Sequence, residues 1–219
     1  MVEVIRGLEA PHVRANLERI RSEIAATGRD PSEVEVLAAV KYVPADELEV
    51  LAEAGLTLLG ENRAQDLVAK AQAHPGRFTW DFIGHLQSRK VRQILPYVRY
   101  IHSVASDSVL IQLGRHARPE TEVLVEVNVA GEPGKTGIEP PELGSFLERC
   151  PVPVVGLMTM PPLASSADQS RPYFAALREL GERYGLRHLS MGTTQDYVVA
   201  VEEGATIVRL GTSLYASEA

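Results

Sequence analysis

The sequence predicts a single (β/α)8 barrel with one extra N-terminal helix. Short apolar runs alternate with helical patterns about eight times along the chain, the number of strand–helix units that closes a parallel barrel. A length of 219 residues is ordinary for one such domain, and a hydrophobic content of 45% supplies its core. Strand–helix alternation requires right-handed crossovers and parallel pairing. An open, doubly wound sheet is the structural alternative.

The extra helix covers residues 8–26. Its apolar side chains recur at helical spacing, and Gly28 and the Asp30-Pro31 turn follow it as stop signals. We therefore expect one long amphipathic helix ahead of the main fold. The recurring apolar positions are Val13, Leu17, Ile20 and Ile24.

The strand–helix units follow in order. Each strand is predicted from a short apolar run and each helix from the helical pattern behind it. No linker interrupts the units, so the whole chain, 1–219, is expected to form one domain, with 131–137 and 160–170 as loops. The predicted strands are 34–40, 56–59, 79–84, 100–104, 122–129, 152–158, 187–191 and 206–210. The predicted helices are 45–54, 62–73, one from Ser88, one from Ser106, 142–148, 168–184 and 195–202.

Composition excludes several classes of protein. A net charge of −7 argues against a nucleic-acid partner, because phosphate backbones require a basic surface. No apolar run can span a bilayer and the N-terminus lacks a secretory apolar region, so we expect a cytoplasmic protein without a membrane partner. The lone cysteine, Cys150, excludes an internal disulfide and is expected to be a structural thiol at a helix end. We expect no metal site.

Lys41 is the first candidate for chemistry, because it directly follows the first predicted strand. Active loops of such barrels lie at the C-terminal ends of the strands. An ammonium held there against apolar walls loses hydration, which lowers its pKa and frees the amine to attack a carbonyl. A lysine that reaches solvent at the barrel rim is the alternative. Lys70 and Lys90 lie in polar helical patterns and are expected to be solvated.

Polar side chains also follow the second and third strands. Asn62 stands at the start of a predicted helix, where it can cap the helix or contact a ligand. His85 follows the third strand, where it can orient a ligand or pair with a neighbouring loop. The residues alone leave these alternatives open.

The last two strands lead into turns of small residues. Backbone N–H groups and hydroxyls at the start of a helix suit an anion, and barrels often bind phosphate on these two loops. Ordinary helix capping is the alternative for each turn taken alone. Arg209 alternates with apolar neighbours in the eighth strand and is expected to point into the barrel, where it needs a partner. The turns comprise Met191, Gly192, Thr193 and Thr194 after the seventh strand, and Gly211 and Thr212 after the eighth.

These candidates together suggest a ligand that carries both a phosphate and an aldehyde. The phosphate would lie on the two turns and the carbonyl carbon would react with Lys41. Pyridoxal phosphate has this chemistry, and so does a sugar phosphate bound by a Schiff-base aldolase. The turns alone do not distinguish the two ligands.

Several long motifs carry a resemblance that extends over nearly the whole chain in order. They are VLAAVKYVP at 36–44, GENRAQ at 60–65, WDFIGHLQSRK at 80–90, VNVAGEPGKTGI at 127–138, GLMTM at 156–160, LSMGTTQDY at 189–197 and VRLGTSLYA at 208–216. With these motifs the chain resembles the pyridoxal phosphate homeostasis protein family. The resemblance implies a barrel like the N-terminal domain of alanine racemase, the type III pyridoxal phosphate fold.

The resemblance also implies roles for individual residues. Lys41 matches the lysine that forms the Schiff base, Asn62 matches an asparagine of the ligand pocket, and Arg209 matches the arginine that faces the pyridine nitrogen. The turn 191–194 matches the phosphate-binding run, with Thr194 where the family usually has serine, and Gly211 and Thr212 match the second phosphate turn. Arg89 is a second departure from the family pattern and adds a charge to a helix expected to be exposed.

Members of this family are thought to buffer and deliver pyridoxal 5′-phosphate without robust turnover, so the resemblance implies a carrier that hands cofactor to apo enzymes. An arginine opposite the pyridine nitrogen opposes its protonation, which mutes carbanion chemistry. The chain ends soon after the eighth strand, so we expect no second domain to close the site. A weak amino-acid racemase is the alternative. Lys135 is a candidate second amine that relays the cofactor, or else a mobile surface lysine. A monomer and a weak dimer both remain open.

Overall fold

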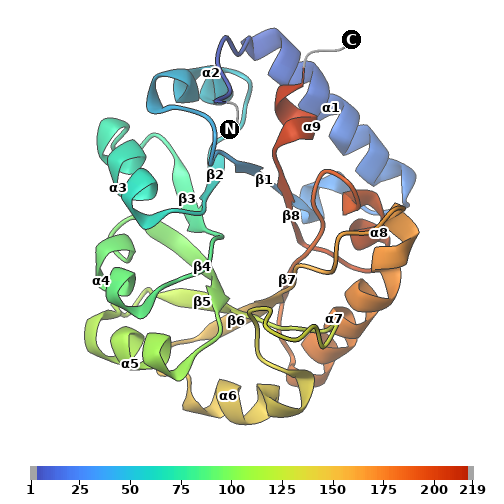
Figure 1. Cartoon of the computed structure of the whole chain (residues 1–219). Coiled ribbons are helices and arrows are strands. Elements are labelled where there is room, and N and C mark those ends of the chain that lie inside the picture. Colours follow the sequence, from blue (N-terminus) through green and yellow to red (C-terminus); the bar gives the residue numbers. More distant parts are fainter. Residues whose placement is uncertain (1–3, 217–219) are drawn as a thin grey trace.

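The computed structural model describes residues 4–216 and contains, within that range, a closed ring of eight parallel strands (Figure 1). Each strand pairs with the next along the chain and the last pairs with the first, so that Val36 lies opposite Val208. The predicted barrel is confirmed and the open sheet is excluded. Residues 1–3 and 217–219 of the predicted domain lie outside the described residues. The strands are β1 (Glu35–Ala39), β2 (Leu58–Glu61), β3 (Thr79–Phe82), β4 (Val98–Val104), β5 (Glu122–Glu126), β6 (Val154–Met158), β7 (His188–Ser190) and β8 (Ile207–Leu210).

Helices surround the outer side of the ring (Figure 1), because each crossover between parallel strands packs back onto the sheet. They are α1 (Ala10–Ala26), α2 (Leu48–Glu53), α3 (Ala64–Ala73), α4 (Val91–Ile94), α5 (Asp107–His116), α6 (Leu143–Arg149), α7 (Arg171–Tyr184), α8 (Tyr197–Glu202) and α9 (Thr212–Tyr215). Short 3-10 turns stand in front of several of them: η1 (Pro31–Glu33), η2 (Ala45–Glu47), η3 (Ser88–Lys90), η4 (Pro140–Glu142) and η5 (Ala167–Ser170).

Some boundaries differ from the prediction. The predicted helix 168–184 begins with a 3-10 turn, and its α-helical part starts at Arg171 because Pro172 favours the first turn of a helix. The helix expected from Ser88 has only one α-helical turn, α4, after η3. Cys150 ends α6, as predicted, and its half-buried thiol has a pKa raised by burial.

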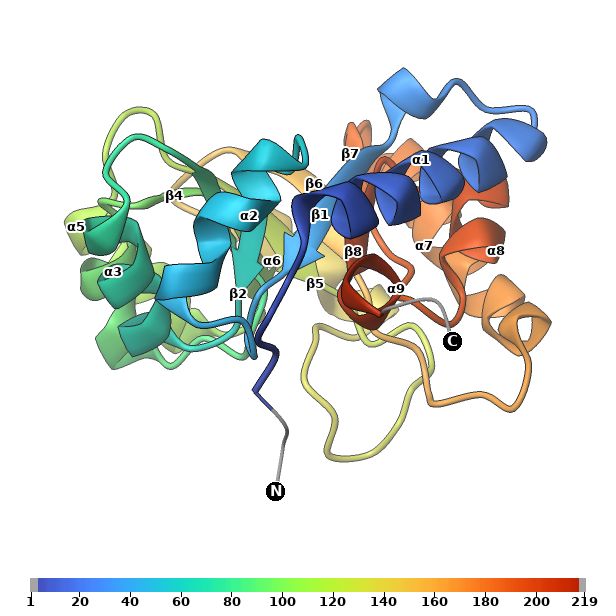
Figure 2. The same ribbon diagram turned by 90° about the horizontal axis from the view of Figure 1, so that it is seen from above.

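Helix α1 packs along one side of the barrel, against α2, α8 and α9 (Figure 2). Its predicted apolar face is confirmed, since Val13, Leu17, Ile20 and Ile24 are all buried. The buried side chain of Asn16 donates hydrogen bonds to the carbonyl oxygens of Leu214 and Ala216 at 3.2 and 3.0 Å. Helix α1 therefore ties the beginning of the chain to its end, over the seam where β8 meets β1.

The predicted strand 122–129 ends at Glu126, and the chain then turns into a long loop. Asn128 holds the start of this loop by two hydrogen bonds with the backbone of Glu132. Gly137 returns the chain to Asn128 with a φ of 116°, where an added Cβ would lie 2.6 Å from the Asn128 nitrogen. Glycine is therefore required at this closure.

The inside of the ring has an apolar end and a polar end. The side chains of Leu37, Tyr100, Leu124 and Ile207 form a small apolar cluster separate from the larger core between strands and helices. Nearer the C-terminal ends of the strands, buried polar side chains point inward. They are His102 on β4, Glu126 on β5, Ser190 on β7 and Arg209 on β8.

Two expected absences are tested only over residues 4–216. No helix in that part of the chain is both long and apolar enough to cross a bilayer. The same residues contain no group of three or more histidine, cysteine, aspartate or glutamate side chains that could hold a metal ion.

Candidate functional site

Lys41 lies in the turn directly after β1, at the C-terminal end of the barrel. The turn begins where the Val40 N–H donates to the carbonyl oxygen of Gly60 on β2, at 2.9 Å. The Lys41 side chain is exposed and its ammonium lies 4.9 Å from the centre of the Tyr42 ring. The prediction that apolar walls surround the Lys41 ammonium is therefore wrong for this structure. The ammonium keeps its access to water.

Lys70 is not the solvated surface charge that we predicted. It is buried, and its ammonium donates to Glu61 Oε1 at 2.5 Å and to the carbonyl oxygen of Val40 at 2.7 Å. The other oxygen of the fully buried Glu61 accepts the backbone N–H groups of Asn62 and Arg63. This ion pair joins the chain just before Lys41 to the chain just before Asn62.

Asn62 does not cap α3, so the capping interpretation is wrong. The N-cap residue is Arg63, which forms no side-chain cap bond. The Asn62 Oδ1 atom is buried and finds no hydrogen-bond partner among residues 4–216. A buried acceptor without a partner costs about 1–3 kcal/mol, so a ligand that donates a hydrogen bond here would remove that cost.

The turns after β7 and β8 lie side by side. The Thr194 hydroxyl is 3.1 Å from the Ser213 hydroxyl, and the Ser213 N–H donates to Thr194 Oγ1 at 3.4 Å. Gly192 has a φ of 91°, and an added Cβ would lie 2.6 Å from the Cβ of Ala200. Only glycine lets the first turn approach α8 this closely. Gly211 and Thr212 open α9 beside Ser213, so the two turns meet at the C-terminal end of the barrel.

Two members of the predicted phosphate run are already engaged. The N–H and hydroxyl of Thr193 both donate to Asp196 Oδ1, at 2.8 and 3.1 Å. The Met191 side chain is fully buried in the core between strands and helices, and its N–H donates to the carbonyl oxygen of Ile207. In this structure the hydroxyls of Thr194 and Ser213 are therefore the better placed groups for an anion.

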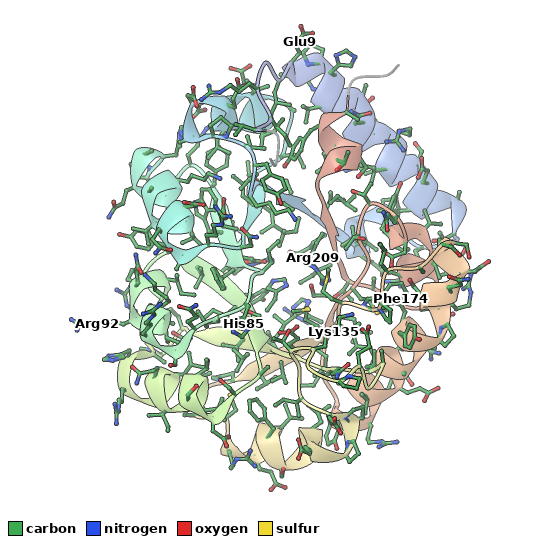
Figure 3. All side chains as sticks on the ribbon, viewed as in Figure 1. Glu9, His85, Arg92, Lys135, Phe174 and Arg209 are labelled. Atoms are coloured by element: carbon green, nitrogen blue, oxygen red, sulfur yellow. The ribbon has the colours of Figure 1, made fainter. Side chains whose placement is uncertain are left out.

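Arg209 points into the barrel, as predicted, and lies near its axis (Figure 3). Its Nη1 donates to the carbonyl oxygen and hydroxyl of Ser190 at 2.7 and 2.6 Å, and its Nη2 donates to the Thr159 carbonyl oxygen at 2.9 Å. Nη2 also contacts the Met160 sulfur at 2.9 Å. Burial lowers the pKa of Arg209 to about 10, against the opposing effect of Glu126. The guanidinium is therefore a cation at neutral pH.

Lys135 stands on the loop after β5, where it forms an ion pair with Glu132. This loop and the segment after β6 protrude from the same end of the barrel (Figure 2). They enclose a hollow of about 560 Å³ whose lining includes Lys135, Met160, Thr193 and Asp196. A smaller hollow of about 180 Å³ has both Lys135 and the exposed His85 in its lining. Lys135 therefore lies close to the turn after β7.

Known proteins resemble this chain over most of its length. It is 39% identical over 213 residues to the pyridoxal phosphate homeostasis protein of Aquifex aeolicus, covering 91% of this chain and 93% of that protein. It is 37% identical to the protein of the same name from Pseudomonas aeruginosa, covering 90% of each. The chain belongs to the pyridoxal phosphate homeostasis protein family. No protein-family model matches it.

Solved structures place this family member among related barrels. The structure of PipY, the COG0325 family member of Synechococcus elongatus, with PLP bound has a TM-score of 0.78 and 31% identity, covering 93% of this chain and all of that one. Alanine racemase from Corynebacterium glutamicum has a TM-score of 0.75 at 13% identity, and this chain covers 64% of it. The racemase likeness shows the fold alone and confirms the expected relation to that barrel.

Three features of this family member were not predicted as parts of the site. Ser213 completes the pair of turns, Lys70 and Glu61 form a buried ion pair, and His102 lies fully buried in the barrel. Lys70 had a readable signal, because it stands with buried Leu67 on the inner face of α3 at helical spacing. His102 follows the inward alternation of β4, but its partners come from strands distant in sequence.

Proposed function

We propose that this chain binds pyridoxal 5′-phosphate through Lys41 and buffers and delivers it in the cytoplasm, with no robust turnover, as a monomer or weak dimer. The observation that carries the proposal is the unpartnered Asn62 Oδ1, buried at the end of the barrel where Lys41, Arg209 and the paired turns also stand. A PLP-bound structure of a family member 31% identical to this chain supports the same ligand.

The chemistry of the donor set fits each part of the cofactor. The Thr194 and Ser213 hydroxyls and the N–H groups that open α9 would hold the phosphate, and Gly192 gives that turn its shape. Arg209 would face the pyridine nitrogen, and the ring hydroxyl would satisfy Asn62 Oδ1. When bound, the aldehyde accepts an amine with loss of water. Lys41, exposed and within reach of solvent, would be that amine.

A carrier is favoured over a catalyst by two features of this chain. Lys41 is exposed to water rather than enclosed, which suits exchange of a ligand more than protected turnover. Arg209 is a cation, so a proton on a ring nitrogen facing it would meet a like charge. A racemase would require steady inversion of L-alanine or L-serine that Lys41→Ala abolishes. Chiral analysis of the incubated protein would detect it, and such turnover would overturn the carrier proposal.

Lys135 supports a delivery step. Its ammonium lies on a protruding loop and lines a hollow together with Thr193, next to the turn that would hold the phosphate. We propose that it accepts the aldehyde from Lys41 before transfer to an apo enzyme. In transfer assays with an apo pyridoxal phosphate enzyme, Lys135→Ala should slow release while leaving equilibrium binding unchanged. Unchanged release and transfer would remove Lys135 from the proposal.

Reductive trapping tests the central claim. Protein loaded with pyridoxal 5′-phosphate should lose its visible absorbance on borohydride treatment, and peptide mass mapping should find the reduced adduct on Lys41. The matched control is Lys90→Ala, because Lys90 follows β3, away from the turns after β7 and β8, and its ammonium donates to Gln93 at 3.3 Å. Lys90→Ala should label as the wild type does. A bound cofactor with unmodified Lys41 would refute the proposal.

A further inference from the structure

A continuous chain of hydrogen-bonded side chains runs through the barrel beneath Arg209. Ser190 Oγ lies 2.6 Å from Arg209 Nη1 and 2.8 Å from His102 Nδ1. The other ring nitrogen of His102 lies 3.0 Å from Asp81 Oδ2. Arg99 ends the chain by donating its Nη2 to the same Asp81 oxygen at 2.7 Å. Asp81, His102 and Ser190 each have 0% of their surface exposed, so bulk solvent does not reach these side chains.

The positions of the protons in this chain follow from what each group can do. Arginine only donates, so Ser190 Oγ accepts from Arg209, and the single Ser190 hydroxyl proton is left for His102 Nδ1. Burial favours a protonated Asp81, but hydrogen bonds from His102 and Arg99 outweigh that effect and lower its pKa. An ionised Asp81 only accepts, so His102 carries its proton on Nε2. Every donor from Arg209 to Asp81 then points in one direction.

Charge explains why the direction matters. Arg209 is a buried cation whose direct partners are neutral: Ser190, the Thr159 carbonyl oxygen and the Met160 sulfur. A buried charge is costly unless anions lie near it, and Glu126 and Asp196 offset only part of that cost for Arg209, since burial still lowers its pKa. Asp81 is an anion at the other end of the chain, and aligned hydrogen bonds polarise one another in a medium of low dielectric constant. A neutral His102 with its proton on Nε2 is the only form that connects the cation to the anion in this alignment.

We propose that Ser190, His102 and Asp81 are positioning residues that orient Arg209 toward the ligand. They act through Arg209 and do not touch the ligand themselves. Ser190, the first member of the hydrogen-bonded chain, binds Nη1 of Arg209. The Thr159 carbonyl oxygen and the Met160 sulfur contact Nη2. Among residues 4–216, Nε has no hydrogen-bond partner. The inference rests on the proposed function, in which Arg209 faces the ring nitrogen of pyridoxal phosphate.

Ser190→Ala isolates this role. It removes the hydroxyl that joins Arg209 to His102 but keeps the Ser190 carbonyl oxygen, which also accepts from Arg209. The matched control is Ser103→Ala. Ser103 is buried next to His102 on β4. Its hydroxyl donates to the Gly84 carbonyl oxygen and does not hydrogen-bond to Arg209. Both variants lose one buried hydroxyl hydrogen bond, so a general effect of the fold would appear equally in both.

The first measurement needs no ligand. Nitrogen-15 spectra of the histidine rings in the apo protein should show His102 neutral, with its proton on Nε2, at neutral pH. Ser190→Ala should shift the Nδ1 resonance of His102 toward that of a ring nitrogen without a hydrogen bond, whereas Ser103→Ala should not. A His102 ring protonated on Nδ1 in the wild type would overturn the inference.

The second measurement is titration with pyridoxine 5′-phosphate, which has the ring and phosphate but no aldehyde for Lys41. Ser190→Ala should weaken binding about fivefold to tenfold, the range expected for one buried hydrogen bond. Ser103→Ala should stay within about twofold. Wild-type affinity in a folded Ser190→Ala would overturn the inference. If Ser190→Ala does not fold, His102→Gln replaces it with the same criterion.

The two measurements separate this inference from the proposed function. If the wild type binds neither pyridoxal 5′-phosphate nor pyridoxine 5′-phosphate, the proposed function fails. The histidine ring spectra still decide whether Ser190, His102 and Asp81 are hydrogen-bonded in the inferred direction. If the wild type binds and Ser190→Ala binds equally well, the proposed function stands and the positioning role is refuted.

Discussion

Thr194 holds its hydroxyl 3.1 Å from that of Ser213, at the meeting point of the turns after β7 and β8. If a phosphate binds here, Thr194→Ala removes one charge-assisted hydrogen bond and should weaken the binding of pyridoxal 5′-phosphate by about 1–2 kcal/mol. Thr194→Ser keeps the hydroxyl and should restore wild-type affinity. Both are measured by equilibrium titration of the apo protein. Unaltered affinity in Thr194→Ala would exclude this residue from the site.

His102 gives the stability of the fold a pH dependence with a definite sign. Burial lowers the pKa of His102 in the folded protein, against the opposing effect of Asp81. In the unfolded chain, the same side chain titrates at its ordinary pKa of about 6.5. The contribution of His102 to stability is fully present above about pH 6.5. It is lost as the pH falls below that value, because the unfolded chain gains a proton on His102 and the folded protein does not. The slope reaches about 1.4 kcal/mol per pH unit for one proton.

His102→Gln should remove this contribution. Urea unfolding between about pH 8 and pH 5 should show the free energy of unfolding of the wild type falling more steeply with acid than that of the variant. His188 also has its pKa lowered, first by burial and then by Arg187, but it is present in both proteins and cancels in the comparison. Parallel curves would contradict the assignment.

At the scale of elements, β1, β2 and α3 are joined by the buried pair of Lys70 and Glu61. Lys70→Met leaves a buried carboxylate without its cation and should lower the free energy of unfolding by about 3–5 kcal/mol. Lys90→Met, at a half-buried position whose ammonium donates to the neutral side chain of Gln93, should cost about 0.5 kcal/mol or less. Urea unfolding measures both.

The same pair should also affect the site, because Lys70 contacts Val40 just before Lys41 and Glu61 holds the N–H of Asn62. Adding Glu61→Gln to Lys70→Met removes the unpaired charge and should recover part of the lost stability. Cofactor affinity should remain reduced in the double variant, since methionine at position 70 no longer donates to the Val40 carbonyl oxygen just before Lys41. Full recovery of affinity would show that the pair serves stability alone.

At the scale of the whole molecule, the barrel could be predicted from the sequence because its signal is periodic and local. The apolar face of α1 and the alternation of strands and helices each lie within a short segment. The orientation of Arg209 also follows from alternation within β8. Its partners Ser190 and Thr159 do not, because they come from other strands and meet Arg209 only through closure of the ring. The side-chain direction of Lys41 likewise depends on the folded turn.

Closure of the ring also predicts how the molecule unfolds. Helix α1 packs against α2, α8 and α9 on the side of the barrel where β1 and β8 meet (Figure 1), and its Ile20 is fully buried in the main core. Ile20→Ala should lower the free energy of unfolding by about 2–5 kcal/mol. A closed sheet leaves no edge strand to separate first, so the loss should be felt across the whole barrel. Trp80 on β3, the only tryptophan of the chain, reports on a strand that does not border the seam.

The fluorescence of Trp80 and the far-ultraviolet circular dichroism should therefore shift together to lower urea concentration in Ile20→Ala, as a single transition. Ile111→Ala is the matched control, because Ile111 on α5 is 53% exposed, and it should change stability by no more than about 0.5 kcal/mol. If circular dichroism falls in Ile20→Ala while Trp80 remains buried, α1 detaches without opening the ring. The seam would then be held by the β1–β8 hydrogen bonds alone, and α1 would be an addition to a barrel that is already stable.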